Sequence, residues 1–93
     1  MEWPEGNKTI FSRQSEMLTH MLVTWRTEAG LTQRQLAERL HREHSLVGRL
    51  ELGERRLDVV EFYWLCKACG VNPETAARPV MRQLQELDAA SPK

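Results

Sequence analysis

Residues 30–53 read GLTQRQLAERLHREHSLVGRLELG, and they predict two short helices separated by a tight turn. Thr32 is an N-cap residue, and Gln35 three positions later completes a capping box that begins the first helix. The second helix is expected over residues 44–52, because Gly53 then supplies a C-terminal stop. About three residues remain between the two helices, so the chain must turn sharply there.

The outer face of the second helix is unusual for a surface that meets only water. Its outward positions are expected to carry Ser45, Leu46, Gly48 and Arg49. A glycine inside a helix costs about 1 kcal/mol relative to alanine, and a purely solvated face favours Glu, Lys and Ala. This face is therefore expected to contact another molecule.

A further helix is expected before this pair, from Ser12 or Ser15 to Glu28. Its apolar residues recur at the spacing i, i+3, i+4 and i+7, which places them in one stripe on one side of a helix. The stripe consists of Leu18, Met21, Leu22 and Trp25. The first eleven residues lack such periodicity and predict a flexible arm.

Helices are also expected after the pair. Asp58 begins one that ends at Gly70, with a buried line made by Val59, Phe62, Leu65, Cys66 and Cys69. Asn72 caps the next one, which Pro79 is expected to interrupt because proline lacks an N–H group. A last helix then extends to about residue 88. With no strand-like alternation, the prediction is an all-α, compact bundle of five or six short helices.

Length and composition restrict the class of protein. The 93 residues suit one small domain, with 41% hydrophobic and 28% charged residues and a net charge of zero. No apolar run is long enough to span a membrane, and the first residues do not resemble a signal peptide, so a cytoplasmic protein is expected. The expected division is a flexible arm over 1–11, a helical domain over 12–73 that contains the pair of short helices, and a C-terminal helical extension over 74–93 that is a possible dimerisation element.

Several linked motifs carry a family resemblance over about residues 18–73. The stretches GLTQRQLAERL, SLVGRLELGERRLDVVEF and CGVNP resemble the Cro and phage-repressor type of helix-turn-helix domain, the xenobiotic-response-element-like family. The resemblance implies a lambda-repressor-like fold in which helix 44–52 enters the DNA major groove. His41 stands where the family usually has a glycine, at a turn position that often needs a positive φ.

The resemblance also implies roles for individual residues. The residues expected to contact base edges are His44, Ser45, Leu46, Gly48 and Arg49. Gln33 matches a family position at a helix start that meets a phosphate, and four arginines are further candidates for phosphate contacts. These are Arg34, Arg42, Arg55 and Arg56. Arg26 and Glu51 match an inward-facing ion pair of the family, which would orient the helices rather than add much net stability.

Two other chemistries compete with this interpretation, a zinc site and an enzyme active site. His41-x-x-His44 and Cys66-x-x-Cys69 resemble the spacing of zinc ligands, but both cysteines fall on a buried helix line and behave there as small hydrophobes. The sequence therefore predicts no metal and no cofactor. It also has no phosphate-binding glycine loop, nucleophile elbow or acidic pair, so no enzyme is expected.

Assembly is indicated by apolar residues away from the expected core. The candidate dimer contacts are Val60, Trp64, Val80, Leu84 and Leu87. A homodimer would present two recognition helices to a palindromic operator on double-stranded DNA, as expected for a repressor or autoregulator. A regulatory protein is a further possible partner. The alternative is an antitoxin-like or other protein-interaction module that keeps the helix-turn-helix core with weak or no DNA binding.

Overall fold

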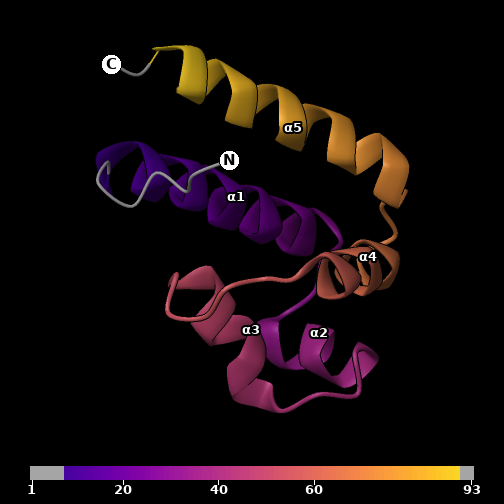
Figure 1. Ribbon diagram of the computed structural model, residues 1–93. Helices are drawn as coiled ribbons and strands as arrows, with labels where there is room; N and C mark the ends of the chain where they lie inside the picture. Colours follow the sequence, from indigo (N-terminus) through magenta and orange to yellow (C-terminus); the bar gives the residue numbers. More distant parts are fainter. Residues whose placement is uncertain (1–7, 91–93) are drawn as a thin grey trace.

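The computed structural model describes the backbone of residues 8–90 and the side chains of residues 12–90. Five helices and no strand lie within these residues, which confirms the all-α fold (Figure 1). They are α1 (Lys8–Glu28), α2 (Gln33–Arg39), α3 (His44–Glu51), α4 (Val59–Ala68) and α5 (Pro73–Ala90). Helix α1 begins four residues before Ser12, so only residues 1–7 of the expected arm remain, and they lie outside the described residues.

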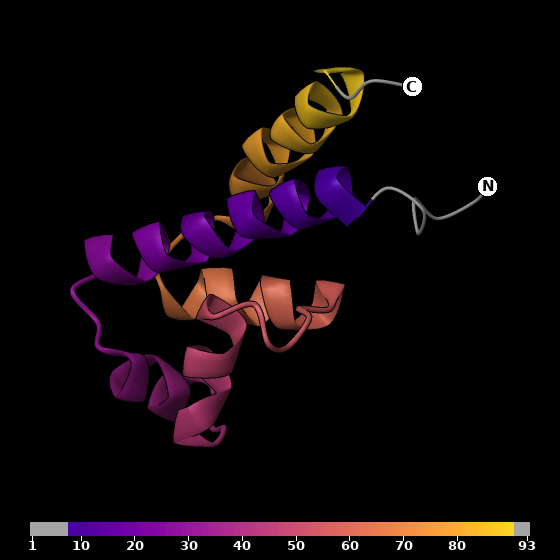
Figure 2. The same ribbon diagram turned by 90° about the vertical axis from the view of Figure 1, so that its left-hand side faces the viewer.

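The helices form two groups joined by α4. The long helices α1 and α5 lie side by side, α4 crosses next to α1, and the short helices α2 and α3 lie at the opposite end (Figures 1 and 2). Helices α1 and α5 run antiparallel (Figure 1), and Gln14 near the start of α1 donates to the carbonyl of Leu84 in the second half of α5. Within the described residues, no helix combines the length and apolar character needed to cross a membrane.

Local signals begin and end the short helices as expected. Thr32 and Gln35 form the capping box of α2, and Asp58 and Glu61 form that of α4. In the turn between α2 and α3, His41 has a φ of 55°, a left-handed conformation that glycine adopts most easily. His41 therefore keeps the sharp turn with a side chain attached, at some cost in backbone strain.

The core lies between α1, α2, α3 and α4. Its buried members are Leu22, Leu31, Leu36, Ala37, Leu46, Val47, Leu50, Leu65 and Cys69. Trp25 and Phe62 close it on one side with an edge-to-face contact at 5.9 Å between ring centroids. Because α3 contributes three of these residues, its inner side is held by the rest of the domain, which supports the outer side as a rigid surface.

Two further details of the predicted helices are wrong. Helix α5 continues through Pro79 without a break, because packing against α1 compensates for the one backbone hydrogen bond that proline removes. Val59 is 83% exposed rather than part of the buried line of α4. It is the first helical residue, and it points away from the side on which Leu65 and Cys66 are buried.

Candidate nucleic-acid interface

The outer side of α3 presents three polar residues. His44, Ser45 and Arg49 are all exposed, and they occupy the first turn of the helix and the position one turn later. The N-cap residue Glu43 makes no side-chain capping bond, so the first N–H groups of α3 receive no side-chain cap from it. These three residues are available to a partner, whereas Val47 and Leu50 on the same helix are buried.

Leu46 does not belong to this surface, and its expected contact with a base is wrong. Its side chain is 4% exposed and lies in the core. Leu46 precedes Leu50 by one turn, and both line the side of α3 that faces Leu57 and Leu65. The resemblance assigned a base contact to Leu46 from its position in the sequence of the helix. The direction of its side chain depends instead on where α4 packs against α3.

Gly48 lies against α2. A Cβ atom added at this position would be 3.4 Å from Oε1 of Gln33, at the start of α2. The same Gln33 donates from Nε2 to Oε1 of Glu51 at 2.9 Å, so its amide is oriented by α3. The glycine therefore leaves room for the Gln33 side chain where α2 and α3 meet.

The ion pair expected between Arg26 and Glu51 is present. Arg26 Nε donates to Glu51 Oε2 at 2.6 Å, and Arg26 Nη2 donates to Oε1 at 3.0 Å. The two side chains are 14% and 8% exposed. Arg26 Nη1 also donates to the carbonyl of Leu31 at 2.9 Å. The hydrogen bonds to Glu51 raise the pKa of Arg26, and the pair joins α1, the following loop and α3.

The candidate phosphate-contacting residues differ in their exposure to solvent. Gln33, Arg34, Arg42 and Arg56 are exposed. Arg55 is half-buried and forms a bidentate ion pair with Glu61, at 2.6 and 3.0 Å, which the sequence did not suggest. These hydrogen bonds lower the pKa of the Glu61 carboxyl, helped by the backbone N–H of Asp58. Arg55 is therefore a structural link between the loop after α3 and the start of α4.

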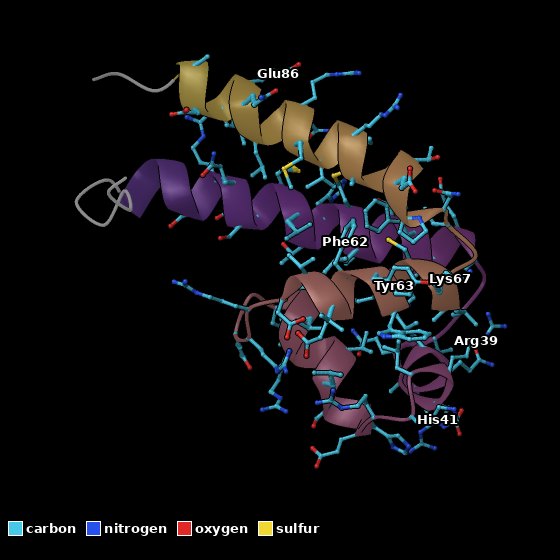
Figure 3. The ribbon with its side chains drawn as sticks, turned by 45° about the vertical axis from the view of Figure 1, so that its right-hand side comes forward. Arg39, His41, Phe62, Tyr63, Lys67 and Glu86 are labelled. Atoms are coloured by element: carbon cyan, nitrogen blue, oxygen red, sulfur yellow. The ribbon has the colours of Figure 1, made fainter. Side chains whose placement is uncertain are left out.

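Sequence reasoning missed the link between the end of α2 and α4. Arg39 Nη1 donates to the carbonyl of Ala68, the last residue of α4, at 2.8 Å. Figure 3 shows Arg39 and Lys67 on this edge of the molecule, with His41 below them. A basic residue near a helix C-terminus satisfies free carbonyls there. No local pattern pairs Arg39 with Ala68, because 29 residues separate them.

The cysteines and histidines of the zinc-like spacing do not come together. Cys66 and Cys69 are buried, with free thiols, while His41 and His44 are exposed. Burial raises the pKa of Cys66 to about 11. In the part of the chain that the structure describes, no three His, Cys, Asp or Glu side chains are grouped as a metal site.

The candidate dimer contacts divide into two sets. Val60 and Trp64 are 66% and 57% exposed on α4. Val80 is 4% exposed, so its expected role as a dimer contact is wrong. Leu84 and Leu87 are half-buried on the same stripe, and Gln14 of α1 donates to the carbonyl of Leu84 at 3.0 Å. Because α5 lies along α1, this stripe packs within the monomer.

Comparisons with known proteins agree with this architecture. A family model described as "Helix-turn-helix domain" matches residues 18–78. The chain is similar to the solved structure of an XRE-family like protein from Pseudomonas syringae pv. tomato str. DC3000, with 38% identity and a TM-score of 0.71. That similarity covers 94% of this chain and 98% of the other. No curated protein matches the chain.

Both comparisons agree with the geometry of the site. The short helices α2 and α3 are joined by a sharp turn, α3 has a polar outer face, and an ion pair fixes α3 to α1. The chain belongs to the Cro/repressor-type helix-turn-helix family of DNA-binding regulators.

Proposed function

We propose that the protein is a sequence-specific transcriptional regulator, a repressor or autoregulator, that reads a palindromic operator as a homodimer. The observation that carries the proposal is the contrast between the two sides of α3. Its inner side is held by the core and by the Arg26–Glu51 ion pair, while His44, Ser45 and Arg49 stand exposed on the outer side. A helix braced in this way can enter the major groove without reordering.

Each exposed residue of α3 has a donor or acceptor suited to base edges. Arg49 carries the planar fork that matches O6 and N7 of guanine. Ser45 can donate or accept through one hydroxyl, and His44 can do either according to its tautomer. Arg49 is therefore the residue expected to contribute most to the choice of sequence.

Contacts to phosphates would come from the start of α2 and from the exposed arginines. The hydrogen bond to Glu51 fixes one N–H of the Gln33 amide, which leaves the second N–H available to a phosphate oxygen at the helix N-terminus. Arg34, Arg42 and Arg56 would add affinity that falls as the salt concentration rises. Such contacts orient the protein on the duplex but carry little sequence information.

The alternative function is an antitoxin-like or other protein-interaction module with weak or no DNA binding. The net charge of zero supports it, because DNA-binding domains usually carry a basic excess. Glu43 and Glu54, which flank α3, are exposed and would lie near the phosphates of a bound duplex. An exposed acidic flank suits a basic partner surface better than DNA.

The test begins with selection of tight binders from random duplex DNA, which reports a motif and its symmetry. Arg49→Ala is then compared with Arg82→Ala, because Arg82 is an exposed arginine of α5, away from α3. Arg49→Ala is expected to weaken binding by about 5- to 150-fold and to relax the choice of one base, since a bidentate base contact is worth about 1–3 kcal/mol. Arg82→Ala should bind as the wild type does. Absence of duplex binding by the wild type at low salt would favour the interaction module.

A further inference from the structure

The loop that joins α3 to α4 passes beside α1 (Figures 1 and 2), and a hollow of about 520 Å³ lies between the two. We call it the α1–loop hollow; residues of α1 between Ser12 and Leu22 line it on one side and residues between Leu50 and Leu57 on the other. Sites for small ligands usually have volumes of about 300–1,000 Å³, so the hollow has room for a small molecule. None of the residues proposed to contact bases lines it.

The deepest part of the hollow is apolar and continuous with the core. Leu22 and Leu50 are buried core residues, and Leu18 and Leu57 are half-buried beside them. Leu52 lines the same hollow but is 74% exposed, although it directly follows the last residue of α3. Removing an exposed leucine from water is favourable, so a ligand with an apolar body would gain from covering Leu52.

Hydroxyl groups line the α1 side of the hollow. Ser12, Ser15 and Thr19 follow one another at spacings of three and four residues, so they lie along one side of the helix. Thr19 Oγ1 donates to the carbonyl of Glu16 at 2.9 Å, and its oxygen can still accept a hydrogen bond. A ligand in the hollow therefore meets hydrogen-bonding groups as well as leucines, which is the usual composition of a small-molecule site.

The charges around the hollow indicate the class of ligand. Arg55 and Arg56 line it on the loop side, and Glu16 lines it on the α1 side. The bidentate ion pair with Glu61 balances the charge of Arg55, so the exposed Arg56 is the residue expected to hold an anionic group. A guanidinium has five N–H donors in a fork that matches a carboxylate. Glu16 repels such a group, which directs it to the loop side.

We propose that the α1–loop hollow binds a small amphipathic carboxylate, with its apolar body on Leu52 and the leucines below it and its carboxylate at Arg56. A molecule bound there touches Leu50 of α3 and the residues that directly follow α3. It also engages Arg56, a candidate phosphate contact, and adds a negative charge beside it. The ligand is therefore expected to weaken binding to a duplex, and a bound duplex weakens ligand binding by the same factor. Only this effect on DNA rests on the proposed function.

An NMR titration of the full chain tests the site without DNA. The probes are octanoate and octylammonium, which share one alkyl chain and carry opposite charges. Octanoate is expected to bind with a dissociation constant on the order of 1–10 mM, as is typical of ligands of this size, and to shift the amide signals of residues 12–22 and 50–57. Octylammonium is expected to bind at least about 5-fold more weakly, because it cannot accept from Arg56. Absence of shifts, shifts confined to other residues, or equal binding of octylammonium overturns the proposal.

Variants test the two ends of the ligand separately. Leu52→Gln is expected to weaken octanoate binding about 3- to 10-fold through lost apolar contact, and Met81→Gln is its control, because Met81 is 57% exposed on α5 outside the hollow. Arg56→Gln is expected to weaken octanoate binding by a similar factor and to leave octylammonium binding unchanged. Its control is Arg78→Gln, which changes an exposed arginine of α5. Melting temperatures near that of the wild type show that the variants are folded. Wild-type affinity in Leu52→Gln or Arg56→Gln, or equal losses in the controls, overturns the proposal.

Binding to a duplex separates this proposal from the proposed function. Saturating octanoate is expected to weaken duplex binding by the wild type about 5-fold or more. Leu52→Gln should bind the duplex as the wild type does without octanoate and respond less to it. If the titration succeeds and no duplex binds, the ligand site stands and the DNA-binding proposal fails. If the duplex binds equally well with and without octanoate, DNA binding stands and the proposed effect of the ligand is overturned.

Discussion

Removing the charge of Glu51 is expected to lower the free energy of unfolding of the whole domain. The change Glu51→Gln keeps the size of the side chain but leaves Arg26 charged, with side-chain exposure of only 14%. Breaking a fully buried ion pair by removing one partner costs about 3–5 kcal/mol. Because the pair retains some solvent contact and the new amide can still accept one hydrogen bond, we expect a loss of about 2–4 kcal/mol in the free energy of unfolding.

Urea denaturation followed by far-UV circular dichroism measures this loss. A change of 1 kcal/mol moves the melting temperature of such a domain by about 4–8 °C, so thermal melting should fall by about 10–30 °C. Glu54→Gln is the control, because Glu54 is exposed just beyond α3 and its loss should change stability by less than about 0.5 kcal/mol.

A double-mutant cycle decides whether the pair itself causes the loss. Replacing both Arg26 and Glu51 by methionine removes the unpaired charge, so the double variant should be more stable than either single methionine variant. The reasoning is refuted if Glu51→Gln costs as little as Glu54→Gln. It is also refuted if the double variant loses the sum of the two single losses.

Three further predictions follow from burial and charge. Leu46→Ala should cost about 2–5 kcal/mol in urea denaturation because Leu46 lies in the core; a loss under about 0.5 kcal/mol would restore its assignment to the outer face. Cys66 and Cys69 should resist a thiol reagent near pH 8 in the folded protein and react after unfolding, because burial raises the pKa values of both thiols; fast labelling of the native protein contradicts this. The hydrogen bonds from Arg55 lower the pKa of Glu61, so this carboxylate stabilises the fold above its unfolded pKa of about 4.3, and the stabilisation is lost as the pH falls through the lower folded pKa. Glu61→Gln should therefore flatten the acid limb of stability against pH, and an unchanged limb would contradict the assignment.

Much of the architecture follows from signals that act over a few residues. Thr32 with Gln35 and Asp58 with Glu61 begin α2 and α4 where the capping boxes predict, because each box satisfies free N–H groups by local hydrogen bonds. The turn is equally local, since His41 adopts its positive φ within a few residues of both helices. The ion pair of Arg26 with Glu51 was expected from the family resemblance and not from any local pattern.

The predictions that were wrong concern positions whose surroundings are set by how helices pack on one another. Pro79 does not end α5, because α1 packs along the helix and outweighs the loss of one hydrogen bond. Val80 is buried within the monomer, and the residues that flank it do not reveal this. Arg55 pairs with Glu61 only six residues away, but the pairing depends on how the loop between them folds back onto the start of α4. In the candidate interface, the structure leaves His44, Ser45 and Arg49 exposed on α3 and buries Leu46, and the contacts of the three exposed residues with bases stay a prediction.

The sequence by itself determined where the short helices α2, α3 and α4 begin and end and how tightly α2 and α3 are joined. Backbone hydrogen bonds within a turn or cap involve neighbours that the sequence places side by side. Only the tertiary structure decided which side of α3 is exposed and that Val60 and Trp64 of α4 are exposed. Those outcomes depend on the angle at which α4 crosses the domain, and that angle is set by side-chain packing between residues far apart in the chain.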